Sequence, residues 1–157
     1  MGPSAIRYAG LDARFKELGH ESIDLGNVET AVAEATDAGD ERARFLPQIR
    51  AACERVAALV ERSARETYLP LVLGGDHSVA LGTLAGMARG HGVGGVLWVD
   101  AHGDLNSPET TPTGNVHGMV LAAALGLAGP LFTDGWGLPA ADPARVALVG
   151  VRSLDDG

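Results

Sequence analysis

The stretch GVLWVDAHGD, residues 95–104, joins an apolar pentapeptide to two acidic residues and a histidine. A short apolar run predicts a strand whose two faces are both buried, as in a parallel sheet that is covered by helices. Ligands of such sheets bind at the carboxyl ends of the strands, where Asp100, His102 and Asp104 follow here. The stretch therefore predicts a parallel sheet and also the position of a functional site.

Helical and strand patterns alternate along the rest of the chain. Apolar residues at helical spacing predict helices over residues 11–18, 41–67, 79–88 and 117–127. Apolar runs predict strands over residues 71–73, 95–99 and 145–151, a further candidate over 21–27, and a turn-rich loop over 129–143. This order predicts an α/β fold of three layers, α-β-α, in which helices cover both faces of a mainly parallel sheet.

The composition limits the possible partners. The chain has 157 residues, 46% of them hydrophobic and 20% charged, which indicates one globular domain. The net charge of −8 argues against binding to nucleic acid or to an anionic membrane surface. No apolar run approaches the roughly 20 residues of a membrane span, and no signal peptide is visible. The single cysteine, Cys53, excludes an internal disulfide and favours a cytoplasmic protein.

The residues Asp100, His102 and Asp104 have the chemistry of a metal site. They alternate, so they share one face if the strand geometry persists. Burial of two carboxylates and an imidazole is costly unless a cation compensates. Oxygen and nitrogen ligands suit Mn²⁺, Fe²⁺ or Zn²⁺, and the lack of thiolates argues against a structural zinc site. An aspartate can also bridge two metal ions, which lower the pKa of a shared water.

Two other motifs allow a structural or a functional interpretation. In GGDHS, residues 74–78, Asp76 and His77 leave a predicted strand, and Ser78 could simply cap the helix that follows. His117 could be an ordinary residue at the start of a helix, or a general acid and proton shuttle.

Taken together, these motifs resemble the arginase branch of the ureohydrolase (arginase–agmatinase) family. The resemblance covers nearly the whole chain, through GPSAIRYAGL (2–11), GHESIDLGNVE (19–29), GGDHS (74–78), DAHGDLN (100–106), SPETTPTGNVHGM (107–119) and VGVRSLDDG (149–157). The loop 107–119 is closer to arginases than to agmatinases. The resemblance implies a metal-dependent hydrolase that converts L-arginine to L-ornithine and urea by means of a metal-bridging hydroxide.

The resemblance also implies a role for each metal ligand. It makes His77 and Asp104 ligands of one manganese ion, His102 a ligand of a second, and Asp100 a bridge between the two. The complete family enzyme carries two Mn²⁺ in each active site. His117 is implied as the catalytic proton shuttle, and Asp104 is counted with it among the catalytic residues.

The implied substrate contacts follow the same motifs. Asn106, Thr113 and Asn115 would hold the α-carboxylate of L-arginine, to which amides and hydroxyls can donate hydrogen bonds without adding charge. Asp155 would bind the α-ammonium group. His102 is implied as a substrate contact as well as a metal ligand.

Against the family pattern, residues 1–157 form a partial metallohydrolase domain. From the resemblance we expect the family's first strand and its carboxy-terminal part, including a third motif with two metal-binding aspartates, to lie outside residues 1–157. Family members form homo-oligomers, which leaves the oligomeric state of this chain open. We expect the isolated chain to fold incompletely and to have little activity.

Three rival functions remain at this stage. A related amidinohydrolase, such as an agmatinase or guanidinobutyrase, would act on a substrate without an α-carboxylate. The chain could also be a non-catalytic fragment that binds metal, or a structural α/β domain without metal.

Overall fold

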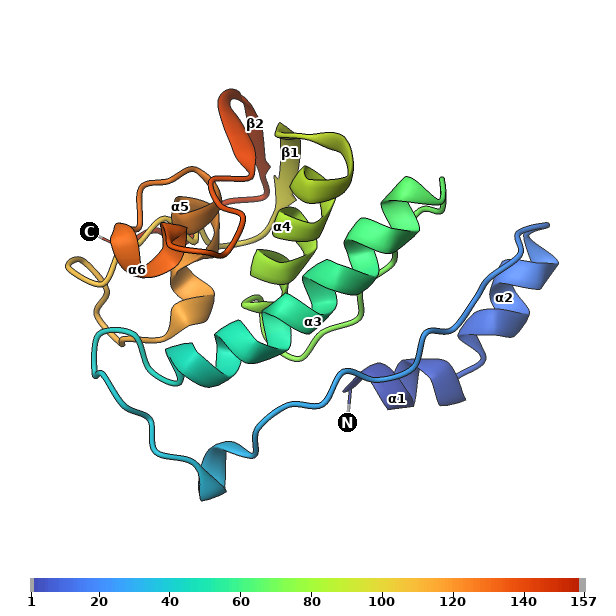
Figure 1. Ribbon diagram of the computed structural model, residues 1–157, viewed down its shortest axis with the longest axis horizontal. Coiled ribbons are helices and arrows are strands. Elements are labelled where there is room, and N and C mark those ends of the chain that lie inside the picture. The colour runs from blue at the N-terminus through green and yellow to red at the C-terminus, as the bar shows by residue number, and fades with distance from the viewer. Residues whose placement is uncertain (1, 156–157) are drawn as a thin grey trace.

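The computed structural model describes residues 2–155 (Figure 1). Its elements in chain order are α1 (Gly2–Tyr8), α2 (Leu11–Glu17), the 3₁₀ helix η1 (Ala33–Ala35), α3 (Leu46–Arg65), α4 (Val79–His91), β1 (Gly94–Val99), the 3₁₀ helix η2 (Val116–Met119), α5 (Val120–Ala124), α6 (Pro130–Thr133) and β2 (Ala141–Val149). Helices α1 and α2 bury no residue, so the core lies in the part of the chain from α3 onward. None of the described helices has the length and apolar character to cross a membrane.

The sheet consists of β1 and β2, which pair in parallel with Trp98 opposite Leu148. Parallel strands need a long crossover, and here residues 100–140 supply it with η2, α5 and α6. The predicted α/β class and the parallel pairing are confirmed. Strand β2 begins earlier than predicted, at Ala141, and the register shifts between Gly94 and Val96.

Two predicted strands are wrong. Residues 71–73 and 21–27 are not strands, because among residues 2–155 no neighbouring strand pairs with their backbone. An apolar run becomes a strand only when another segment accepts and donates its backbone hydrogen bonds. Leu69, beside the first of these runs, is 93% exposed.

Several helix boundaries also differ from the sequence-based prediction. Helix α3 begins at Leu46 rather than near residue 41, because Pro47 is tolerated only in the first turn of a helix. The helix predicted over 117–127 is divided into η2 and α5 and ends at Ala124, just before Gly126 adopts a positive φ of 77°. Pro130 likewise begins the short helix α6 inside the predicted loop.

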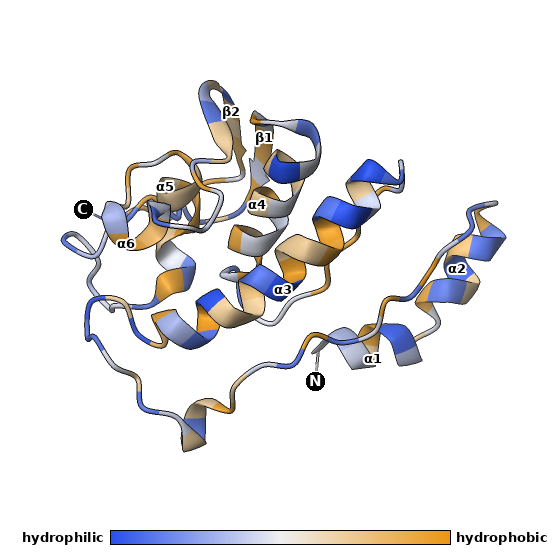
Figure 2. Ribbon diagram, viewed as in Figure 1, coloured by the Kyte–Doolittle hydropathy of each residue, from blue (hydrophilic) through white to orange (hydrophobic). Residues whose placement is uncertain are grey.

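Helices α3 and α4 pack closely through two glycines. Hydrophilic and hydrophobic residues alternate along the turns of α3, which is the pattern of an amphipathic helix (Figure 2). A Cβ atom on Gly82 would lie 2.5 Å from the Cys53 carbonyl oxygen, and one on Gly86 would lie 2.6 Å from that of Ala57. The two helices can therefore approach this closely only because residues 82 and 86 have no side chain.

The close packing of α3 and α4 also controls the protonation of the Cys53 thiol. This cysteine lies in α3, is buried, and donates a hydrogen bond from Sγ to the Ser78 carbonyl oxygen at 3.3 Å. Burial raises the pKa of the thiol to about 11. The thiol is therefore protonated at neutral pH, when it is a poor nucleophile.

We predict that Gly86→Ala loosens the α3–α4 pair. Overpacking costs about 1–3 kcal/mol, and the better helix propensity of alanine offsets about 1 kcal/mol of this. Amide hydrogen exchange in α3 and α4 should accelerate several-fold. Gly94→Ala is the matched control, since a Cβ there meets no atom within 4 Å. Unchanged exchange in Gly86→Ala would contradict the close contact.

We further predict that Cys53 reacts slowly with thiol reagents in the folded chain. A rise of the thiol pKa to about 11 leaves roughly 100-fold less thiolate near neutral pH, and burial adds a barrier to access. The rate should rise to that of a free cysteine in concentrated urea. Equal rates with and without urea would show that the packing of α3 against α4 does not bury Cys53.

Candidate metal centre

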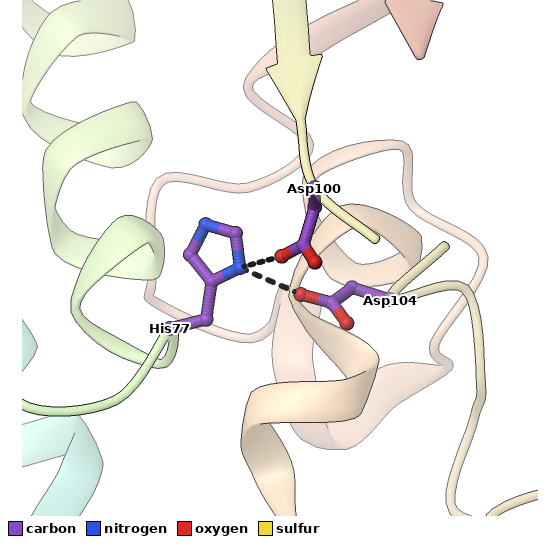
Figure 3. A group of neighbouring side chains, drawn as sticks. All are labelled: His77, Asp100 and Asp104. Carbon is purple, nitrogen blue, oxygen red and sulfur yellow. Dashed lines mark ion pairs between the residues drawn. The ribbon is translucent and has the colours of Figure 1, made fainter. Parts of the chain in front are cut away.

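Three side chains from separate segments converge at the carboxyl end of β1. His77 lies in the turn before α4, Asp100 directly follows β1, and Asp104 lies in the loop before η2. Each offers one ligand atom, and these atoms all lie within 4.8 Å of one another. His77 Nδ1 is 2.9 Å from Asp100 Oδ2 and 2.8 Å from Asp104 Oδ2 (Figure 3). We call these three residues the metal cluster, because together they could hold a metal ion.

A tight turn places His77. A Cβ on Gly74 would lie 2.5 Å from Val79 Cγ1, so the turn can be this tight only with glycine at position 74. Asp76 Oδ1 accepts hydrogen bonds from the backbone N–H of Ser78, at 3.0 Å, and from the Ser78 hydroxyl. Ser78 makes no side-chain capping bond to α4, so the proposed capping serine is wrong and Asp76 holds the turn instead.

Asp100 faces a histidine on each side. Its Oδ2 faces His77, while its Oδ1 accepts the backbone N–H of His102 at 2.9 Å and lies 3.2 Å from His102 Nδ1. The backbone hydrogen bond from His102 is the main cause that lowers the pKa of Asp100 below its usual value. The side chain is therefore kept as a carboxylate, which is the form that binds a cation.

Backbone hydrogen bonds fix the position of Asp104. It has a positive φ of 49°, a conformation that aspartate tolerates better than most residues. Its carbonyl oxygen accepts the N–H groups of Leu121 and Ala122, at 3.0 and 3.1 Å, and so binds the start of α5. Asp104 is only 8% exposed, and this burial raises the pKa of its carboxyl.

The metal cluster leaves two carboxylates to share one histidine nitrogen. Asp104 Oδ2 lies 2.8 Å and Asp100 Oδ2 2.9 Å from His77 Nδ1, and Asp104 Oδ2 has no further partner among the described residues. One ring nitrogen carries at most one proton, so it cannot satisfy carboxylate oxygens from both aspartates. A buried carboxylate without a partner is costly. A divalent cation would compensate both charges, and a set of one nitrogen and two carboxylate oxygens suits Mn²⁺.

His102 lies beside the metal cluster and outside it. Strand β1 ends at Val99, and the backbone then bends, so Asp100, His102 and Asp104 do not form the single row that continued strand geometry would require. The His102 side chain is 65% exposed and contacts only Asp100 among the cluster residues. Its roles as a second metal ligand and as a substrate contact remain predictions.

The other predicted site residues form pairs close to these motifs. Asn106 Nδ2 donates to Asp155 Oδ2 at 2.7 Å, although the two residues are 49 positions apart. Thr113 Oγ1 accepts the backbone N–H of Asn115 at 3.2 Å. His117 stands in η2 with Nδ1 3.9 Å from Asp76 Oδ2.

Sequence reasoning did not single out Trp98. Its indole ring stacks on the His77 imidazole, with ring centroids 4.3 Å apart and 20° between the planes. The alternation of side chains along β1 was the available signal, because Trp98 is two positions before Asp100 and therefore points to the same face.

The chain is similar to known arginases along its whole length. The model of the Arginase family matches residues 1–157. The arginase of Bacillus caldovelox is 49% identical over 159 residues, which cover 100% of this chain and 53% of that protein. The arginase of Bacillus subtilis (strain 168) is 45% identical over 158 residues, with 100% and 53% covered. The chain thus spans about half the length of these relatives.

Solved structures agree with the fold. The native arginase of Bacillus caldovelox at pH 5.6 superposes with a TM-score of 0.93 at 49% identity, over 100% of this chain and 53% of that one. The arginase of Entamoeba histolytica in complex with L-ornithine gives a TM-score of 0.84 at 31% identity, over 99% and 52%. The small parallel sheet and its helices therefore correspond to about half of the arginase fold.

We predict opposite effects of Asp104→Asn on metal binding and on metal-free stability. Loss of a carboxylate ligand should weaken Mn²⁺ binding at least about tenfold in calorimetry. The same change removes a buried charge that shares its one histidine partner with Asp100, so the metal-free chain should become more resistant to urea. Asp37→Asn, an exposed aspartate outside the metal cluster, should change neither quantity. Weaker metal-free stability in Asp104→Asn would show that the contact with His77 fully compensates the buried Asp104 charge.

Proposed function

This chain belongs to the Arginase family, and on that premise we propose that it carries the first half of a site that hydrolyses the guanidinium group of L-arginine to L-ornithine and urea with manganese. The observation that carries the proposal is the metal cluster. It holds a buried carboxylate oxygen, Asp104 Oδ2, whose only close partner among the described residues is a histidine nitrogen that it shares with a second carboxylate.

The cluster supports a division of ligands between two manganese ions. His77 and Asp104 would hold one ion, and His102 the other. Asp100 would contact both, because its two oxygens face His77 and His102 respectively. When bound, such a metal pair lowers the pKa of water and makes hydroxide available near neutral pH. The residues in turn fix the positions of these charges: Asp104 through its contact with α5, and Asp100 through the backbone of His102.

The substrate's amino-acid end would lie between the hydrogen-bond donors of the loop and Asp155. Asn106, Thr113 and Asn115 would orient the α-carboxylate, while the Asp155 carboxylate would bind the α-ammonium group. The hydrogen bond between Asn106 and Asp155 supports this, because it places an amide beside the Asp155 carboxylate. The Entamoeba histolytica relative holds L-ornithine, an α-amino acid with the same two groups.

His117 would move a proton between the site and solvent. Its side chain is partly exposed, and Nδ1 lies near the carboxylate of Asp76, which can orient the ring. Asp104 would be the second catalytic residue beside His117, and it would hold its negative charge close to the reacting water. His102 would remain near enough to Asp100 to contact substrate as well as metal.

A related amidinohydrolase that acts on agmatine is the nearest alternative. The loop 107–119 is the feature that favours L-arginine as the substrate instead. Agmatine has no α-carboxylate, so the donors of Thr113 and Asn115 would have no anion to bind. A non-catalytic metal-binding fragment is the second alternative, and it would bind Mn²⁺ without releasing urea from either substrate.

We predict slow, manganese-dependent urea release that is faster from L-arginine than from agmatine. Asn115→Ala should reduce this preference by about 10- to 100-fold, since a hydrogen bond to a charged group contributes about 1.5–3 kcal/mol. Asn27→Ala, outside the loop, is the control. Equal rates from both substrates would favour the related amidinohydrolase. Manganese binding with no urea from either would favour the non-catalytic fragment.

A further inference from the structure

We propose that Trp98 is a positioning residue of the metal centre, whose indole ring holds the His77 imidazole with Nδ1 directed at Asp100 and Asp104. The inference rests on the proposed manganese site and adds a residue that contacts none of the ions. Its basis is the stack of the two rings, with centroids 4.3 Å apart and planes 20° from parallel.

The indole is a rigid support. Trp98 is 5% exposed, belongs to the hydrophobic core, and pairs with Leu148 in the sheet. Asp100 directly follows β1 and its N–H still bonds to the Val149 carbonyl at 3.1 Å, so Trp98 and Asp100, two positions apart, lie on the same face. His77 therefore meets an apolar ring and a carboxylate on one surface, with Nδ1 2.9 Å from Asp100 Oδ2.

Besides the stack, the described residues contact the His77 ring only through Nδ1, at the two carboxylates of the metal cluster. Metal-binding histidines usually donate their second ring N–H to a carboxylate or carbonyl, which sets the orientation of the ring. The Nε2 of His77 has no such partner within the described range, and the Asp76 carboxylate is occupied by Ser78. The stack supports the face of the ring, while the two carboxylates contact its edge at Nδ1, and together they can limit rotation of His77 before a metal binds.

The indole N–H has no part in this role. Trp98 Nε1 is buried and has no hydrogen-bond partner among the described residues, so packing alone orients the ring. Phenylalanine would keep an aromatic face and remove the unsatisfied donor. Leucine would keep an apolar side chain and remove the aromatic face.

The test begins without metal, by NMR of the histidine rings. In the wild type, the ring current of Trp98 should shift the His77 ring protons upfield, and the signals are assigned by comparison with His77→Gln. The shift should persist in Trp98→Phe and disappear in Trp98→Leu. Absence of the shift in the wild type would overturn the inference, while the metal cluster could still be tested through Asp104→Asn.

The second measurement is the affinity for Mn²⁺ by calorimetry. Trp98→Leu should weaken binding about tenfold, the lower end of the effect of residues that orient metal ligands, and Trp98→Phe should restore it. Trp136→Leu removes another fully buried tryptophan and tests for general core damage. Trp98→Met serves if Trp98→Leu does not fold.

Each outcome of the calorimetry decides the question. Weaker binding in Trp98→Leu with near-normal binding in Trp98→Phe and Trp136→Leu supports the positioning role. Equal losses in Trp98→Leu and Trp136→Leu overturn it in favour of general destabilisation. Unchanged binding in Trp98→Leu also overturns it. A wild type that binds no Mn²⁺ overturns the manganese site and this role together, even where the NMR shift shows that the stack exists.

Discussion

The backbone of Asp104 joins the metal cluster to the hydrophobic core. Its carbonyl oxygen accepts two N–H groups at the start of α5, whose five residues are all buried. The same residue adopts a positive φ and directs its carboxylate toward His77. Because core packing holds α5, the carboxylate cannot move to solvent without disturbing the core. The position of a charged group thus depends on the apolar contacts of the helix to which its own carbonyl is bonded.

This constraint produces an electrostatic conflict. Burial raises the pKa of Asp104, while the His102 backbone hydrogen bond lowers that of Asp100, so the two carboxylates differ although they face the same histidine nitrogen. A site that destabilises one of its own charges is typical of a functional centre. A cation relieves the conflict. The stability of the three charged groups of the metal cluster should therefore depend on a bound cation, whereas the packing of Trp98 and α5 is apolar and should not.

The sequence predicted the three residues of the metal cluster but not how they contact one another. GVLWV correctly indicated a strand with polar residues at its carboxyl end, because the apolar run and the acidic group are adjacent in the chain. The run at 71–73 has the same local character, yet it forms no strand in the described residues. An apolar run in the sequence does not show whether another strand is available to pair with it. Equally, spacing alone did not show that the backbone bends after Val99 and leaves His102 apart from Asp104.

The sequence by itself determined the chemical types at the site, its place after β1 and the membership of the chain in the Arginase family, because these depend on residues close together in the chain. Tertiary structure alone decided which groups meet. His77 contacts Trp98 and Asp100, from which it is separated in the chain by α4, and Asn106 contacts Asp155, which is 49 positions away in the chain. Such contacts depend on how helices and strands pack, including the close approach at Gly82 and Gly86. Packing is a property of the whole core, so no local pattern of residues specifies it.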